Sequence, residues 1–147
     1  MDKIKVLRRN KLIKKLFEKT MALNNDVVKT PCKLRIQSKG RISGQAKYTY
    51  SKNTLLIRKM SVVINPKMIK IWDIKKGYDN FYYTGRAEKI NRYIVGNYKK
   101  ALRFVLLHEV GHIIFYNKYG ISRIHNTSLK RKEKYADNFA IRHINVI

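Results

Sequence analysis

The hydrophobic positions along the chain change their period twice, and each change predicts a different kind of element. Near the N-terminus, residues 3–22 carry apolar side chains every three to four positions, while Lys and Arg fill the rest: Ile4, Leu7, Ile13, Leu16, Phe17 and Met21. This spacing predicts a basic amphipathic helix. We expect its apolar side to pack on the domain; an arm that binds nucleic acid is the alternative.

Apolar and polar residues then alternate through the region between Cys32 and Asp73, which predicts a small mixed or antiparallel sheet. The predicted strands are 33–37, 46–50, 54–58, 61–64 and 68–72. Residues 73–96 show no clear period and combine several aromatic residues with glycines. They are expected to form either a loop over a cleft or another hairpin.

The period becomes helical again after Asn97, which is a good N-cap residue, and Gly120 is placed where a helix commonly ends. Apolar side chains surround this segment, so the helix is expected at the centre of the molecule. A last helix is predicted from Thr127 or Ser128 to about Ile144. The fold class is therefore α+β, with the sheet packed on the central and final helices.

The length of 147 residues and the 44% hydrophobic content suit a single domain. Its expected parts are a basic helix (1–24), a strand-rich part (33–96) and two C-terminal helices (97–147). Cys32 is the only cysteine, and neither a secretory signal nor an apolar run of about 18 residues occurs. We therefore expect a cytoplasmic protein without a transmembrane segment; the sequence does not predict its oligomeric state.

The net charge is +25, from 34 Lys and Arg against nine Asp and Glu. Such a charge attracts polyanions, so nucleic acid, an acidic protein and anionic lipid are all candidate partners. A merely solvated basic surface is the alternative.

Candidate chemistry lies in the central helix, where residues 108–112 read HEVGH. Residues four apart on a helix lie one above the other, so His108 and His112 can bind one ion. Glu109 lies beside that face, where it can act as a general base. Zn²⁺ is the natural ion for this set; buried structural histidines are the alternative.

A catalytic zinc usually has a third protein ligand, and the final helix offers Glu133, with Asp137 four residues later. Glu133 could bind the metal while Asp137 accepts the free N–H of a ligand histidine. Two surface acids paired with lysines are the alternative. His125 is a rival third ligand, whereas His143 has no suitably spaced partner.

The HEVGH motif followed by ExxxD on a second helix resembles the gluzincin metallopeptidases, and the string EKYADNFA resembles the ImmA/IrrE group most; minimal gluzincins share this pattern. The resemblance implies a compact zincin-like fold, with zinc bound by His108, His112 and Glu133. It also implies Glu109 as the base and DNA-associated proteins as substrates.

The string HEVGHIIFYNKYGISRIH is also similar to SprT-like proteases, which would make His125 the third ligand. The segment 44–50 suits that family too. The Gly and aromatic residue expected after that histidine are missing from residues 126–129, a departure that favours Glu133.

The sequence thus predicts a zinc-dependent metallopeptidase that hydrolyses peptide bonds with a metal-activated water and Glu109 as general base. Acidic or DNA-associated proteins are the expected substrates. A strand from the 54–72 region is expected to line the cleft, and Tyr116, Tyr119 and His125 are candidates for stabilising the oxyanion. The alternative is a non-catalytic basic protein, associated with nucleic acid or a particle, that has a structural or vestigial zinc site.

Overall fold

The fold combines five helices with a three-stranded sheet in a computed structural model that describes residues 2–70, 82–94 and 97–145. In chain order, the described elements are α1 (Lys3–Leu23), β1 (Cys32–Ile36), β2 (Gly44–Tyr50), β3 (Ile57–Ile64), α2 (Pro66–Lys70), α3 (Arg86–Ile94), α4 (Tyr98–Asn126) and α5 (Leu129–His143). The predicted α+β class is confirmed.

The sheet has the strand order β1-β3-β2, so β3 is central and β2 is an edge strand. Strand β1 runs parallel to β3, whereas β2 runs antiparallel to it. The two predicted strands 54–58 and 61–64 are instead the single strand β3. Residues before Ile57 belong to a turn, in which the Ser51 N–H donates to the Leu56 carbonyl at 3.0 Å and Leu55 has a φ of 57°.

Two predictions between the sheet and the central helix were wrong over the residues that the structure describes there, 68–70 and 86–94. The predicted strand 68–72 is the short helix α2 as far as Lys70; residues 71 and 72 lie outside the described part. Pro66 starts this helix, a position at which its fixed φ and missing N–H are no disadvantage. The helix α3 occupies part of the region 73–96, for which a loop or hairpin was expected, and it buries Ile90 and Ile94. Two of the aromatic residues of this region, Tyr78 and Phe81, lie outside the described residues.

Helix α4 begins as predicted, with the Asn97 side chain accepting a hydrogen bond from the Lys100 N–H at 3.0 Å. Gly120 interrupts it with a φ of 81° and a ψ of 175°, but helical residues continue to Asn126. The predicted break is therefore real, although it is a kink rather than the end. Helix α5 begins after its N-cap Ser128, in agreement with the prediction.

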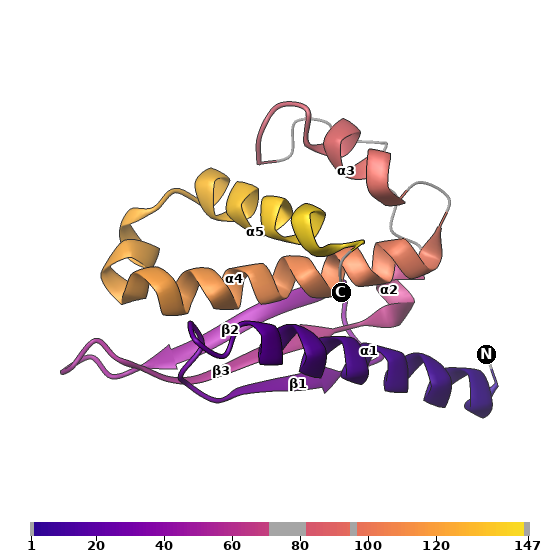
Figure 1. The fold of residues 1–147 in the computed structure, drawn as a ribbon, viewed down its shortest axis with the longest axis horizontal. Helices are drawn as coiled ribbons and strands as arrows, with labels where there is room; N and C mark the ends of the chain where they lie inside the picture. The colour runs from indigo at the N-terminus through magenta and orange to yellow at the C-terminus, as the bar shows by residue number, and fades with distance from the viewer. Residues whose placement is uncertain (1, 71–81, 95–96, 146–147) are drawn as a thin grey trace.

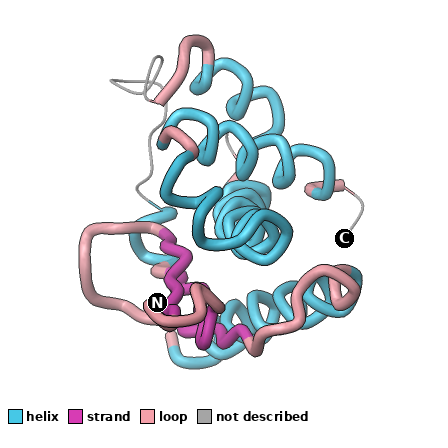
Figure 2. The backbone as a smooth tube through the Cα atoms, turned by 90° about the vertical axis from the view of Figure 1, so that its left-hand side faces the viewer, coloured by secondary structure: helices cyan, strands magenta, loops and turns pink. Residues whose placement is uncertain are grey.

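The elements surround α4 (Figure 1). The sheet packs on one side of α4 and α5 on the other, and the end-on view of Figure 2 shows strands below this central helix and helical turns above it. Helices α4 and α5 are in tight contact, because a Cβ at Gly111 would lie 3.0 Å from Ala136 Cα. Gly111 on α4 and Ala136 on α5 therefore let the two helix backbones come close together.

Helix α1 joins this core through only part of its predicted apolar side. Ile13 and Phe17 are buried in the common core, whereas Ile4 and Leu7 are 63% and 68% exposed. No helix in the described ranges is long and apolar enough to cross a membrane.

Candidate metal centre and active site

Two helices bring together three side chains that can bind a metal ion. His108 and His112 face the same way because they are one helical turn apart on α4, and Glu133 approaches them from α5. The Glu133 Oε2 lies 2.9 Å from His108 Nε2, its Oε1 lies 3.2 Å from His112 Nε2, and the two Nε2 atoms are 3.2 Å apart. One ligand atom from each residue thus falls within 4.8 Å of the others.

Asp137 lies behind this cluster and orients His108. Its Oδ1 is 2.7 Å from His108 Nδ1, so the His108 Nε2 is left to face Glu133 and His112. The Asp137 side chain is fully buried and also accepts hydrogen bonds to Oδ2 from Tyr83 Oη at 2.7 Å and from Arg86 Nε at 2.8 Å. The geometry therefore agrees with the predicted role of Asp137.

Tyr83 and Arg86 were not predicted as part of the site. Arg86 is buried, and its Nη2 lies 3.3 Å from Asp137 Oδ1 and 3.8 Å from Glu133 Oε2. Tyr83 lies just before α3 and Arg86 is the first residue of that helix, a stretch in which the sequence contains no recognisable motif. The one signal in the sequence was indirect. Glu133 and Asp137 lie on a helix face that becomes buried, and buried carboxylates require cations or hydrogen-bond donors from elsewhere in the chain.

The charges of the cluster compensate one another. Burial lowers the pKa of His108, but hydrogen bonds with Asp137 and Glu133 outweigh burial and raise this pKa from 6.5 to about 10. Burial raises the pKa of Glu133, but hydrogen bonds with His108 and His112 bring it well below its usual range. Asp137 behaves in the same way, through His108 and Arg86. The protonated His108 ring balances the negative charge of Glu133 and Asp137. A bound cation would replace the proton in that role.

Glu109 lies on the same helix, on the side facing the sheet. Its carboxyl is buried, Oε2 has no hydrogen-bond partner among the described residues, and burial raises its pKa. Strand β2 approaches closely at Gly44, where a Cβ would lie 2.8 Å from Val105 Cγ1 and 3.0 Å from Glu109 Cγ. A glycine at this position therefore lets the strand pass directly beside Glu109.

The cluster opens into a hollow of about 180 Å³ between β2, α4 and the start of α5. It is lined by Gly44, Gln45, Ala46, Glu109, His112, Tyr116, Leu129, Lys132 and Glu133. The strand beside the site is thus β2, and the prediction of a strand from the 54–72 region was wrong. Strand β3 occupies the middle of the sheet, where both of its edges are already paired.

The other predicted side chains differ in their distance from this hollow. Tyr116 lines it, and its ring stacks on that of His112 with centroids 6.2 Å apart. Tyr119 is 42% exposed and contacts the Phe115 and Tyr135 rings instead. His125 is exposed and lies edge-on to the Tyr50 ring, outside the three-residue cluster.

His143 is also remote from the cluster, as expected. Its Nδ1 donates to the Phe139 carbonyl at 2.7 Å, and its ring stacks on Phe139.

The residues present fit a zinc ion. Two imidazole nitrogens and one carboxylate are a ligand set of catalytic zinc sites, in which a fourth position stays open for water or substrate. The hollow borders His112 and Glu133, so that position would face it. Asp137 supplies the carboxylate that ligand histidines commonly contact, whereas His112 Nδ1 is buried without such a partner among the described residues.

Comparison with known families identifies the kind of protein to which this site belongs. The sequence profile of the Peptidase U49 family matches residues 56–146, which is more than half of the chain. The chain belongs to the Peptidase U49 family. The matched segment runs from the start of β3 through α5, so the Peptidase U49 region contains all three candidate metal ligands and Glu109.

Membership of Peptidase U49 makes this chain a peptidase by family, with proteins or peptides as its class of substrate. This agrees with the predicted protease and disfavours the non-catalytic binding protein. The finer resemblances to the ImmA/IrrE group and to SprT-like proteases are not part of this match and stay predictions. No curated protein and no solved structure matches the chain.

Proposed function

We propose that this Peptidase U49 member is a zinc-dependent endopeptidase in which His108, His112 and Glu133 hold the ion and Glu109 is the general base. One observation carries the proposal. Three suitable ligand atoms converge within 4.8 Å, next to a buried carboxyl group whose Oε2 has no partner among the described residues. A buried carboxyl with an unpartnered oxygen beside metal ligands is well placed for proton transfer, whereas a purely structural metal site does not require one.

The chemistry divides between the ion and the chain. A bound zinc ion supplies Lewis acidity, which activates water and polarises a peptide carbonyl. Glu109 takes a proton from the attacking water as its oxygen bonds to the carbonyl carbon. Glu109 then delivers that proton to the amide nitrogen as the C–N bond breaks. Asp137 keeps the His108 ring in a fixed orientation throughout.

The substrate would lie along β2 as an extended chain. Residues 44–46 of this edge strand line the hollow, and an edge strand presents unpaired backbone groups to which a peptide can bind. Of the three predicted oxyanion donors, Tyr116 is the one that lines the hollow, and burial raises its pKa, so its phenol keeps the proton to donate. The charge of +25 favours acidic or DNA-associated proteins as substrates.

The proposal is tested by measuring bound zinc and cleavage of casein, an unfolded acidic protein, for the wild type and for Glu109→Gln. We expect both proteins to bind about one zinc ion per chain. The rate of the variant should fall by about 10² to 10⁴, because general acid–base catalysis typically contributes that factor. A wild type that binds zinc and cleaves neither casein nor acidic peptides would contradict the proposal and favour a non-catalytic role.

The ligand assignment has its own test, in which zinc content is compared for Glu133→Ala and His125→Ala after dialysis against a weak chelator. Loss of zinc is expected for Glu133→Ala, whose carboxylate contacts both histidines. His125→Ala should retain zinc and is a matched control, because His125 lies outside the cluster. Loss of zinc with His125→Ala alone would overturn the assignment.

A further inference from the structure

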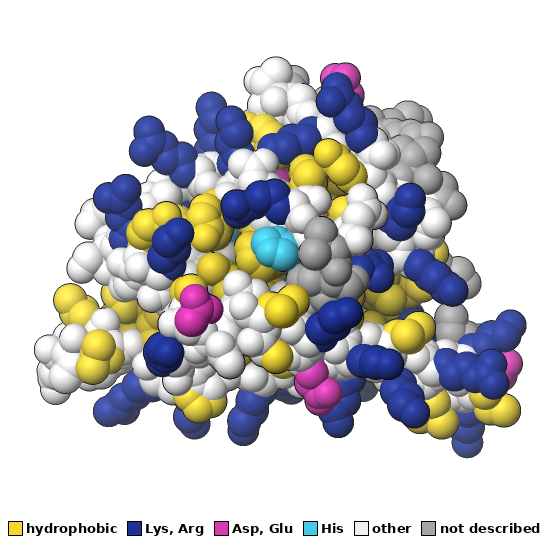
Figure 3. Space-filling model, viewed as in Figure 1, with side chains coloured by type: hydrophobic (Ala, Val, Ile, Leu, Met, Phe, Trp, Pro, Cys, Tyr) yellow, Lys and Arg dark blue, Asp and Glu magenta, His cyan; other side chains and the backbone are white. Residues whose placement is uncertain are grey.

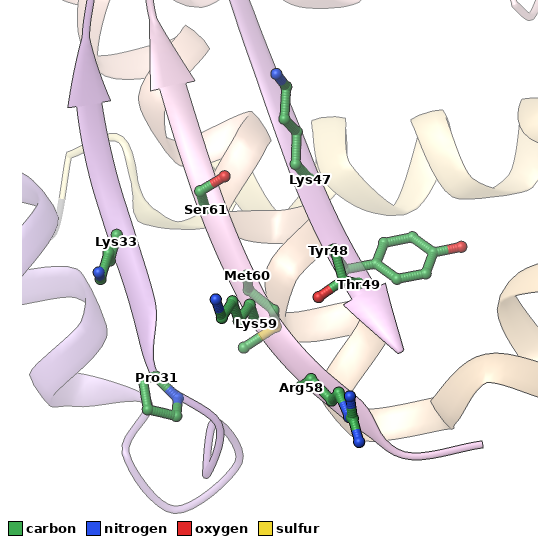
Figure 4. Close-up of a pocket in the computed structure, with 9 residues that line it drawn as sticks. All are labelled: Pro31, Lys33, Lys47, Tyr48, Thr49, Arg58, Lys59, Met60 and Ser61. Carbon is green, nitrogen blue, oxygen red and sulfur yellow. The ribbon is translucent and has the colours of Figure 1, made fainter. Parts of the chain in front are cut away.

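The outer face of the sheet contains a second hollow, of about 470 Å³, that is separate from the candidate metal centre. It is lined by Pro31, Lys33, Lys47, Tyr48, Thr49, Arg58, Lys59, Met60 and Ser61 (Figure 4). Figure 4 views the sheet from this face, with β1 and β3 running in one direction, β2 in the other and the helices behind them. We call this face, with Lys33, Lys47, Arg58 and Lys59, the basic sheet face.

Strand register determines which side chains share this face. Lys33 on β1 and Lys47 on β2 both pair with Ser61 on the central strand, which makes one row across the sheet. Lys59 and Thr49 pair in the next row. These side chains alternate with the ones that pack on α4, so the three lysines point away from the core and are exposed.

The basic sheet face is positively charged without local compensation. None of the nine lining residues is acidic, and its four cationic side chains form no ion pair with another described residue. Neighbouring strands are about 4.8 Å apart, so Lys33 and Lys47 start about 10 Å from each other, on either side of the Ser61 hydroxyl. Cations and hydroxyls at this spacing are suited to hold several phosphate groups.

We propose that the basic sheet face binds nucleic acid through its phosphates, without reading the base sequence. A protein partner fits less well, because protein interfaces are depleted in Lys and depend on aromatic or other large anchors in their centre. Tyr48 also borders the hollow, but its ring lies against that of Tyr116 on α4, with centroids 4.7 Å apart. Tyr48 is the one aromatic residue among the nine that line the hollow, and its ring packs on Tyr116, so base stacking is disfavoured and contacts to phosphates remain.

The basic sheet face and the candidate metal centre lie on opposite sides of the sheet. Glu109 and Tyr116 lie on α4, which packs on the inner side, whereas Lys33, Lys47 and Lys59 project from the outer side. Both surfaces can be occupied together. The inference is independent of the proposed peptidase activity, since Glu109→Gln should bind nucleic acid as the wild type does.

The test compares two triple variants that lose the same charge. The first replaces Lys33, Lys47 and Lys59 by Gln; the control replaces Lys118, Lys130 and Lys134, exposed residues on α4 and α5, by Gln. Binding to a mixed-sequence DNA duplex of about 20 base pairs is followed by fluorescence anisotropy between about 50 and 200 mM NaCl. Thermal melting checks that each variant is folded, and the three single variants replace the first triple if it is not.

We expect the first triple variant to bind at least about tenfold more weakly, and the slope of log K against log salt to fall by about 2 to 3, because each phosphate contact contributes about 0.9. The control should keep most of the wild-type slope. Equal weakening of both variants would overturn the inference, since it would show an effect of net charge alone. Competition by polyglutamate as strong as that by DNA would also overturn it, in favour of an acidic protein partner.

Discussion

Asp137 accepts hydrogen bonds from side chains that belong to three separate parts of the chain. His108 comes from α4, Arg86 from α3, and Tyr83 from the segment before it. Because the carboxylate is fully buried, it depends on these partners for compensation, and they depend on it for orientation. Asp137 is therefore placed to orient His108, and in the proposed zinc site it would act through that ring rather than as a ligand.

Replacing Asp137 by Asn is expected to weaken zinc binding by about 10- to 100-fold, the typical effect of losing such an outer carboxylate. A neutral amide accepts the His108 hydrogen bond less strongly, and Arg86 loses its nearer carboxylate partner but keeps Glu133 at 3.8 Å. The affinity is measured by competition with a chelating dye, with thermal melting as a check on folding. Asn138→Ala is the matched control on the next α5 residue, and an equal loss of affinity there would contradict the orienting role.

The sequence predicted some of these residues and not others, for a physical reason. His108, Glu109 and His112 are recognisable because the helical repeat alone places them together. Asp137 and Glu133 are recognisable because they share one face of a second helix. Tyr83 and Arg86 reach Asp137 across 54 and 51 residues of chain, and no local pattern encodes such a contact.

At the scale of elements, the site depends on how closely α5 approaches α4. A Cβ at Gly111 would lie 3.0 Å from Ala136 Cα, 3.1 Å from Phe139 Cβ and 3.2 Å from the Ala136 carbonyl oxygen. The closeness of the backbones at Gly111 allows Glu133, one turn before Ala136, to reach both histidines. The small residues on the facing surfaces, Gly111 and Ala136, are what permit this approach.

Gly111→Ala is expected to destabilise the protein by about 1 to 3 kcal/mol, the usual cost of forcing an extra carbon into a packed core. The sign of the change in the free energy of unfolding is informative, because helix propensity alone would make this substitution stabilising by up to about 1 kcal/mol. Urea unfolding of the wild type and the variant measures the difference. A variant as stable as the wild type, or more so, would show that the two helices can separate at little cost.

Element prediction failed where the alternation of apolar residues was ambiguous. Residues 66–70 alternate like a strand, yet Pro66 after Asn65 is also a helix start, and the helix formed. The segment 86–94 has a clear helical face, with Ala87, Ile90 and Ile94 buried, but aromatic residues and glycines before it suggested a loop or hairpin. Short segments of this kind are decided by the core on which they pack rather than by their own sequence.

At the scale of the whole molecule, positive charge is spread over the surface. Dark-blue Lys and Arg side chains are spread over the face seen in Figure 3 and project along its lower border, where Figure 1 places α1 and the sheet. Lys132 lines the hollow itself. A molecule with a charge of +25 attracts acidic substrates over distances at which no specific contact exists.

At low salt, kcat/KM is therefore expected to be higher for an acidic peptide than for a neutral peptide of the same length. The advantage should shrink several-fold between about 20 and 300 mM NaCl, because the screening length falls below the size of the site. Fluorogenic peptides that differ only in Glu against Gln at flanking positions measure the ratio. A salt-independent ratio would indicate direct contacts in the hollow instead of long-range attraction.

The position of Lys47 bears on self-association as well. An open edge strand that accepts a peptide could equally accept the same strand of a second copy, as in many aggregating sheets. Lys47 is the middle residue of β2, so a symmetric antiparallel pairing centred on the strand would set Lys47 against Lys47 of the other copy. Like charges directly opposite each other are destabilising. The open edge of β2 therefore disfavours pairing with β2 of a second copy. It stays open to a peptide that carries Asp or Glu opposite Lys47.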